Sequence, residues 1–91
     1  MAIPAHADSP EDQFVSDLLD YSYRPPGSQS YWIQMGYQVC RNLSLAVSKG
    51  YDLADADQYL ENQLMVKPGW NFESAASLVG AAETYLCPQL N

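Results

Sequence analysis

Apolar residues recur at steps of three and four along four segments of the chain, and clusters of proline, glycine and polar residues separate these segments. Such steps place the apolar side chains on one face of a helix. No segment alternates apolar and polar residues over the length of a strand, so the pattern predicts an all-α domain, a small bundle of about four helices. The predicted domain covers residues 9–89, and residues 1–8 are expected to form a disordered tail.

The first helix is predicted from Pro10 to Tyr21. Ser9 can cap its free amide groups, and the two acidic residues after Pro10 face the positive end of the helix dipole. The paired prolines further along cannot continue a helix, so residues 22–29 are predicted to form a loop.

The second predicted helix is the longest, with Ser30 as its N-cap and Gly50 as its C-cap glycine. Gly36 lies inside it and costs about 1 kcal/mol relative to alanine, which indicates that another helix approaches closely there. Its apolar stripe consists of Trp32, Met35, Gly36, Val39, Leu43, Ala46 and Val47.

The third and fourth helices are separated by a turn at residues 67–69, and Asn71 is the predicted cap of the fourth. The third has an acidic start, and we expect its acids to be solvated because their spacing is not that of a calcium loop. These acids are Asp52, Asp55, Asp57 and Glu61, and the apolar stripe is Leu53, Ala56, Leu60 and Leu64. The fourth carries Phe72, Ala75, Ala76, Val79, Ala82 and Leu86 on one side, with Glu73 and Glu83 facing away.

The composition excludes several classes of partner. The chain has 91 residues and a net charge of −7, from 11 acidic and four basic residues. This charge opposes binding to nucleic acid and to anionic lipid headgroups. No apolar stretch approaches the roughly 20 residues that span a bilayer, so no membrane-spanning helix is expected. A chain this short buries only about 60% of its unfolded surface, so an additional constraint on the core is expected.

Two cysteines could supply that constraint. Cys40 falls in the middle of the second predicted helix and Cys87 at the end of the fourth. A disulfide between them would close a loop that contains the third helix, which is worth about 4 kcal/mol in the chain-entropy model. The alternative is a pair of buried free thiols. A zinc site is disfavoured, because two cysteines without histidine cannot complete its ligand shell.

Catalytic and cofactor motifs are missing from the sequence. His6 is the only histidine and lies in the tail, so the domain cannot build Ser-His-Asp, Cys-His or His-metal arrangements. We therefore expect no enzyme activity, no metal and no cofactor.

The seven tyrosines and two tryptophans exceed what a small core needs, and they cluster near helix ends. Such side chains suit a partner surface, although they could also close the ends of the core. Our partner-binding hypothesis assigns the surface to Tyr21, Tyr23, Arg24, Tyr31 and Trp32. The alternative hypothesis is a carrier of a lipid-like or haem-like apolar ligand held near Trp32, Met35 and Met65.

Three stretches carry a resemblance to a known family: Gly-Tyr-Gln-Val-Cys-Arg-Asn-Leu at residues 36–43, the alanine-rich residues 75–82, and Tyr-Leu-Cys-Pro at residues 85–88. The chain resembles the small exported mycobacterial proteins grouped as domain of unknown function family 732 (DUF732). The resemblance covers residues 11–88. Its most specific element is the pairing of Gly-x-x-Val-Cys with Tyr-x-Cys-Pro.

The resemblance implies a secreted or cell-envelope protein with oxidised cysteines and no established activity. It favours reading Ala5-His6-Ala7 as the remnant of a signal-peptide cleavage site; the alternative is an ordinary alanine-rich tail. The chain departs from the family pattern at residues 23–27, 31–33 and 45–57. We expect a binding property particular to this chain, for a protein or envelope partner, in these departures.

Overall fold

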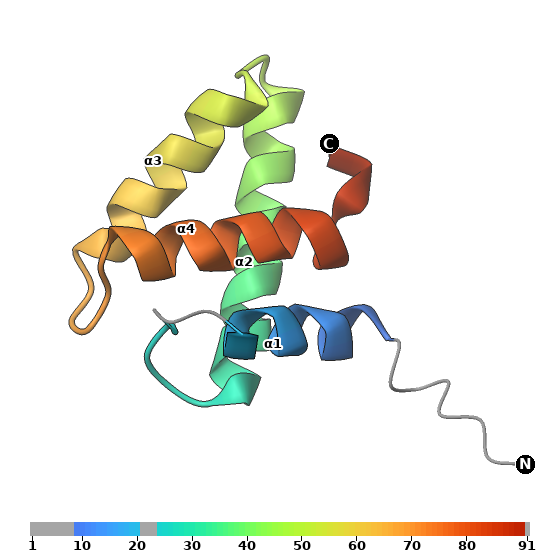
Figure 1. The fold of residues 1–91 in the computed structure, drawn as a ribbon. Coiled ribbons are helices and arrows are strands. Elements are labelled where there is room, and N and C mark those ends of the chain that lie inside the picture. Colours follow the sequence, from blue (N-terminus) through green and yellow to red (C-terminus); the bar gives the residue numbers. More distant parts are fainter. Residues whose placement is uncertain (1–8, 21–23, 91) are drawn as a thin grey trace, which may run out of the picture.

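Four α-helices follow one another in the computed structural model, which describes residues 9–20 and 24–90 (Figure 1). They are α1 (Pro10–Asp20), α2 (Gln29–Ser48), α3 (Leu53–Met65) and α4 (Phe72–Ala81). A π-helical segment, η2 (Ala82–Leu86), continues α4, and a short 3-10 turn, η3 (Pro88–Leu90), follows. The described residues contain no strand, so the all-α prediction is confirmed.

The two N-terminal helices begin at serine caps. Ser9 Oγ accepts a hydrogen bond from the amide of Asp12 at 3.1 Å, as its position predicts. The predicted cap of α2, Ser30, is wrong: Ser28 is the cap, and its Oγ accepts from the amide of Tyr31 at 3.2 Å. The positive φ of Gly27, 96°, turns the chain just before Ser28, so the helix begins two residues earlier than its apolar stripe indicates.

The turn between α2 and α3 is a Schellman motif. Gly50 adopts a φ of 95°, and its amide donates to the carbonyl of Val47 at 3.0 Å. The amide of Tyr51 donates to the carbonyl of Ala46 at 3.1 Å. The predicted C-cap glycine is therefore confirmed, and the motif fixes the position at which Tyr51 leaves α2.

The turn between α3 and α4 has proline followed by a positive-φ glycine, Gly69, the pattern of a type II turn. The amide of Trp70 closes it by donating to the carbonyl of Lys67 at 3.2 Å. Asn71 then caps α4 as predicted: its Oδ1 accepts from the amide of Ser74 at 2.8 Å, and Ser74 Oγ accepts from the Asn71 amide at 3.0 Å. This reciprocal pair is a capping box.

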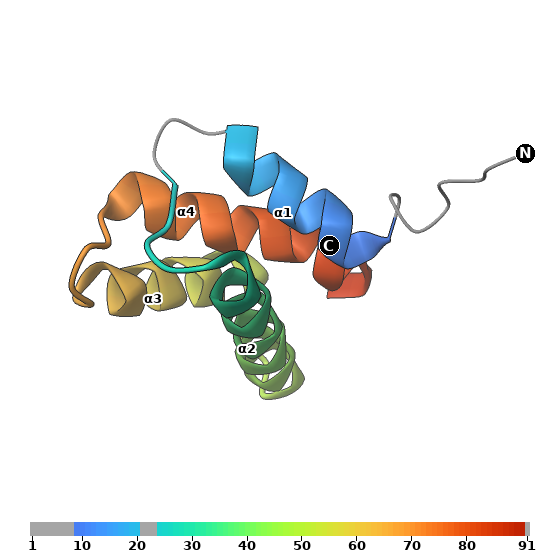
Figure 2. The same ribbon diagram turned by 90° about the horizontal axis from the view of Figure 1, so that it is seen from below.

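The C-terminal helix is the centre of the molecule. In both views, α4 lies between α1 and α3, and α2 crosses it (Figures 1 and 2). The small side chains Ala75 and Ala81 of α4 and Ala82 of η2 are buried against these neighbours, together with Leu78 and Val79. Because helices cover α4 on several sides, its buried surface is broader than the stripe that the sequence predicts.

For two residues of α4 and its continuation η2, the exposure to solvent is the opposite of the one predicted. Phe72 is exposed, because it is the first residue of α4 and lies beyond the edge of the core. The sequence predicts Glu83 in solvent, but it is only 8% exposed, because it lies in η2, where neighbouring helices also cover the polar side. Glu73, at the other end of α4, is exposed as predicted.

A disulfide joins Cys40 of α2 to Cys87, immediately after η2. The bond spans 47 positions of the sequence and encloses all of α3 and α4. The predicted disulfide is thus confirmed. It ties the central helix to α2 at the end opposite to the α3–α4 turn.

Candidate functional site

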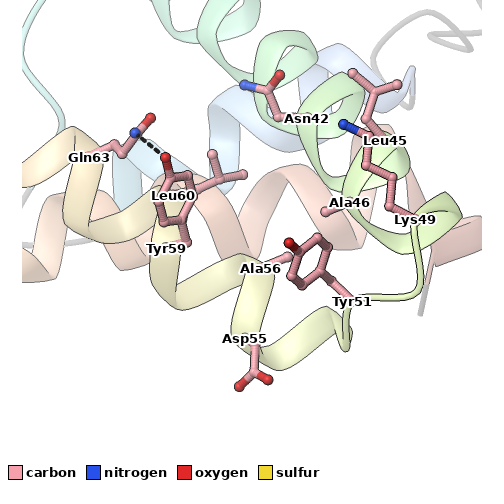
Figure 3. A pocket seen from close by; sticks show the side chains of 10 residues that line it. All are labelled: Asn42, Leu45, Ala46, Lys49, Tyr51, Asp55, Ala56, Tyr59, Leu60 and Gln63. Carbon is pink, nitrogen blue, oxygen red and sulfur yellow. Dashed lines mark hydrogen bonds between the residues drawn. The ribbon is translucent and has the colours of Figure 1, made fainter.

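A cleft of about 710 Å³ lies between the C-terminal half of α2 and the facing side of α3 (Figure 3). The two helices diverge from the Gly50 turn, as Figure 1 shows at the top of the molecule. The residues that line the cleft are Asn42, Leu45, Ala46, Lys49, Tyr51, Asp55, Ala56, Tyr59, Leu60 and Gln63.

Large apolar side chains of the cleft are exposed to solvent. Leu45 is 52% exposed, Tyr51 63% and Tyr59 62%. Beneath them, Ala56 and Leu60 are buried and belong to the core. The cleft is therefore an opening onto the core with an apolar floor and an apolar rim, a kind of surface that marks interaction sites.

Local structure sets the positions of the two tyrosines. The Schellman motif carries Tyr51 from the end of α2 into the space between the helices (Figure 3). Tyr59 lies one turn before Gln63 on α3, and its hydroxyl accepts a hydrogen bond from Gln63 Nε2 at 2.8 Å. This bond limits the freedom of both side chains, so less conformational entropy is lost when a partner covers them.

The polar residues of the cleft lie on both helices. Asn42 and Lys49 come from the α2 side and Gln63 from α3. Asp55 also belongs to α3, and its carboxylate points away from α2 in Figure 3. Amide and ammonium groups around an apolar floor can orient a bound group by hydrogen bonds, while the aromatic rings supply contact area.

A buried acidic contact lies on another side of α3. Glu83 of η2 forms a side-chain hydrogen bond with Asp57, which is half-buried on α3. Burial, this hydrogen bond and the negative charges of Asp57 and Glu61 raise the pKa of Glu83 to about 8. Burial and the charge of Asp57 also raise the pKa of Glu61. The expectation that these acids are simply solvated thus holds for Asp52 and Asp55, which are exposed, and is wrong for Asp57 and Glu61, which are half-buried.

The described residues of the partner-binding hypothesis differ in their exposure to solvent. Tyr21 and Tyr23 lie outside the described residues. Arg24 is exposed, and Tyr31 is half-buried against the core. Trp32 is only 4% exposed, and the structure therefore assigns it to the core and not to an exposed aromatic cluster.

Trp32 also fixes the loop that precedes α2. Its Nε1 donates to the carbonyl of Pro26 at 3.1 Å. Pro25, beside it, is buried. The proline pair is therefore part of the packing of the loop onto the core.

The residues of the carrier hypothesis do not lie in the cleft. Met35 joins Trp32 in the core, and Met65 is partly exposed near the end of α3. None of these three side chains is among those that line the space between α2 and α3.

The sequence pattern indicates one segment that lines the cleft, although it does not predict the cleft itself. The departure from the family pattern at residues 45–57 contains Leu45, Lys49 and Tyr51, all of which line the cleft. The sequence pattern assigns no role to Tyr59 and places Glu83 in solvent, where it does not lie. A signal existed for Tyr59, which is a large aromatic residue off the apolar stripe of α3; Glu83 gave none, because an acid on a helix is ordinarily exposed.

The described residues hold no group of three or more side chains arranged to bind a metal ion. Within the same part of the chain, none of the helices is both long and apolar enough to cross a bilayer.

Comparison with known proteins yields one family. The model of the family described as "Protein of unknown function (DUF732)" matches residues 10–89. No curated protein and no solved structure matches the chain significantly.

Proposed function

We propose that this chain, which belongs to the DUF732 family, is a non-enzymatic binding module that holds the apolar face of a helix from a protein partner. The observation that carries the proposal is the cleft between α2 and α3. Leu45, Tyr51 and Tyr59 expose apolar surface on its walls. Aromatic side chains of this kind are enriched among the residues that dominate binding energy.

The shape of the cleft favours a helix as its occupant. On α2 and its C-cap residue Lys49, the lining residues are spaced three, four and seven positions from Asn42, so they form one continuous helix face. The lining residues of α3 also form one face, from Asp55 to Gln63. A third helix laid between two diverging helices can pack its side chains into both faces, as in other helix-in-groove complexes.

Charge favours a partner helix with basic flanks. The chain carries a net charge of −7, and both Asp52 and Asp55 are exposed at the start of α3, beside the cleft. Negative potential over this edge speeds association with a cationic partner and disfavours an anionic one. Lys49, on the opposite wall, gives one position at which an acidic group of the partner is favoured.

The proposed place of action is outside the cytoplasm, in the secreted or cell-envelope fraction. The Cys40–Cys87 disulfide supports this location, because disulfides persist in oxidising compartments and are rare in reducing ones.

A second candidate function is a carrier of a small apolar ligand, which the volume of the cleft favours. About 710 Å³ falls within the range of small-molecule sites, roughly 300–1,000 Å³. The exposure of Tyr51 and Tyr59 favours the protein partner, since a carrier encloses its ligand.

Photo-crosslinking from the cleft separates the two functions. A photoreactive phenylalanine derivative replaces Tyr59 in the full chain, and a matched control carries it at Phe72, which is similarly exposed but lies outside the cleft. Both proteins are irradiated with the envelope fraction of the source cells, and the adducts are identified by mass spectrometry. We expect a discrete protein adduct from position 59 and not from position 72.

Affinity measurements complete the test. A synthetic peptide of the crosslinked segment should bind the wild-type chain and lose at least tenfold in affinity for L45S/Y59S, about 1.4 kcal/mol. The Phe72→Ser variant should bind as the wild type does. A small apolar adduct at position 59 would support the carrier instead. The same protein adducts from both positions, or none from position 59, would overturn the assignment of the cleft.

A further inference from the structure

Four exposed apolar side chains surround the turn between α3 and α4. Val66, the C-cap residue of α3, is 82% exposed, Phe72, the first residue of α4, is 54% exposed, and Met65 is 39% exposed. Pro68, between them, is also exposed. The turn lies at one end of the molecule in both views, away from the crossing of α2 and α4 (Figures 1 and 2). We call these four side chains the apolar tip.

Buried residues hold both ends of the turn. Leu64 and Trp70, which flank it, belong to the core. The amide of Lys67 donates to the carbonyl of Leu64 at 3.0 Å, and the amide of Trp70 donates to the carbonyl of Lys67 at 3.2 Å. A Cβ atom at Gly69 would lie 3.4 Å from Pro26 Cβ, so the turn also packs against the loop before α2. The apolar tip is therefore a fixed feature of the surface.

The backbone of the turn is suited to an apolar medium. A polar group that enters such a medium without a hydrogen-bond partner is costly. The amides of Lys67 and Trp70 have partners within the turn, and Pro68 has no amide hydrogen. The amide of Asn71 donates to Ser74 Oγ at 3.0 Å. These groups can leave water without losing their hydrogen bonds.

Charge distinguishes this end of the molecule from the rest. Lys67 is the only charged residue among residues 62–72. This stretch therefore carries a charge of +1, whereas the other residues, with three basic and 11 acidic side chains, carry −8. A lysine beside apolar side chains can place its stem in an apolar medium and its ammonium group among lipid phosphates. The separation of charge orients the turn toward such a surface.

The size of the apolar tip favours lipid over a protein partner. A stable protein interface uses about 20–30 residues a side, and the tip has four side chains. The turn also projects past the ends of α3 and α4 (Figure 1). A projecting turn needs a matching hollow in a protein, whereas a bilayer adapts to its shape.

We propose that the apolar tip inserts into the interface of a lipid bilayer and attaches the protein to the membrane surface without crossing it. The four side chains then lie at the boundary between headgroups and acyl chains, and the Lys67 ammonium group remains among the phosphates. The surface that fits best is zwitterionic, because the acidic remainder of the chain is repelled by anionic lipids. Attachment by so few side chains is reversible.

This attachment goes beyond the proposed function and does not depend on the cleft. The α3 helix has 13 residues and is therefore about 20 Å long. The Gly50 turn, from which the cleft opens, lies at the other end of this helix. A protein attached by its apolar tip thus keeps that end of the cleft away from the bilayer.

Sedimentation with sucrose-loaded phosphatidylcholine vesicles tests the attachment on the full, oxidised chain. The wild type should sediment in proportion to the lipid concentration, and V66S/F72S should lose at least about tenfold in partition coefficient, because two apolar side chains no longer insert. Val47→Ser is the matched control: Val47 is an exposed valine of α2 that lies outside both the tip and the cleft. This variant should bind as the wild type does.

A gain-of-binding variant covers the case in which V66S/F72S does not fold, as judged by circular dichroism. Val66→Trp should raise the partition coefficient at least about threefold, because tryptophan prefers the membrane interface. A spin label on the headgroups of phosphatidylcholine nanodiscs should broaden the amide NMR signals of residues 65–72 and leave those of residues 42–49 unchanged.

Three results would overturn the proposal: no sedimentation of the wild type, equal binding of folded V66S/F72S and the wild type, or broadening centred outside residues 65–72. A photoreactive residue at position 66, irradiated with the envelope fraction, should give lipid adducts. Protein adducts there would assign the tip to a protein partner instead. Because the vesicles contain no protein, the sedimentation result is independent of the crosslinking from position 59.

Discussion

At Gly36, α2 meets two other parts of the chain. A Cβ atom at this position would lie 2.6 Å from Leu86 Cδ1 and 2.8 Å from Phe14 Cζ. Leu86 belongs to η2 and Phe14 to α1, so a single missing methyl group allows both to pack on α2. Phe14 is completely buried, so it cannot shift without displacing other core side chains. The close approach that the sequence indicates at Gly36 is therefore present.

Glycine-to-alanine substitutions at two helical positions should have opposite effects. Gly36→Ala should destabilise the protein by about 1–3 kcal/mol, because overpacking exceeds the gain in helix propensity. Gly80→Ala should stabilise it by up to about 1 kcal/mol, since nothing lies within 4 Å of the added Cβ and the helix gains propensity. Thermal unfolding followed by circular dichroism measures both. Equal shifts in Tm at the two positions would contradict the packing at Gly36.

At the scale of elements, the caps and turns define where each helix begins and ends. The serines before and inside α2 illustrate how closely the sequence can locate such a boundary. Ser28 and Ser30 are both suitable capping residues, and only two positions separate them. The choice of Ser28 depends on the positive φ of Gly27, which is a property of the loop and not of the helix pattern.

The two serines should respond differently to replacement by alanine. Ser28→Ala should cost about 1 kcal/mol, because the amide of Tyr31 loses its acceptor. Ser30→Ala, at an exposed position within the first turn, should be neutral or slightly stabilising because alanine has the higher helix propensity. Urea unfolding of the two variants gives the comparison. A larger loss for Ser30→Ala would mean that α2 begins at the later serine.

On the scale of the whole molecule, one covalent bond ties together parts that are far apart in the sequence. The Cys40–Cys87 disulfide encloses α3, α4 and η2 in a single loop. It also fixes the segment that contains Glu83 to α2. A domain of this size has a small core, and one such bond is a large share of its stability.

Removal of the disulfide should destabilise the protein by about 4 kcal/mol in the chain-entropy model for a loop of this length. The double variant C40A/C87A and the wild type under reducing conditions should both show this loss in urea unfolding. The wild type without reductant is the control. A loss below about 1 kcal/mol in both would indicate that the packing of α4 against α2 suffices without the cross-link.

Features that depend on neighbouring residues could be predicted from the sequence. Helical periodicity, the cap at Asn71, the C-terminal glycine of α2 and the turn at residues 67–70 all follow from local geometry. The pairing of Cys40 with Cys87 could also be predicted, because the chain contains only two cysteines. The family was recognised from the same local motifs, and its model matches residues 10–89.

Which surfaces remain open and which polar groups are buried depends on how the helices pack against one another. Tyr59 and Leu60 are neighbours in the sequence, yet Tyr59 lines the rim of the cleft and Leu60 its floor, because α2 and α3 diverge at an angle that no local pattern specifies. Glu83 is buried because α4 and η2 are surrounded by other helices. Burial and open space are properties of how helices pack together, so residues far apart in the sequence determine them.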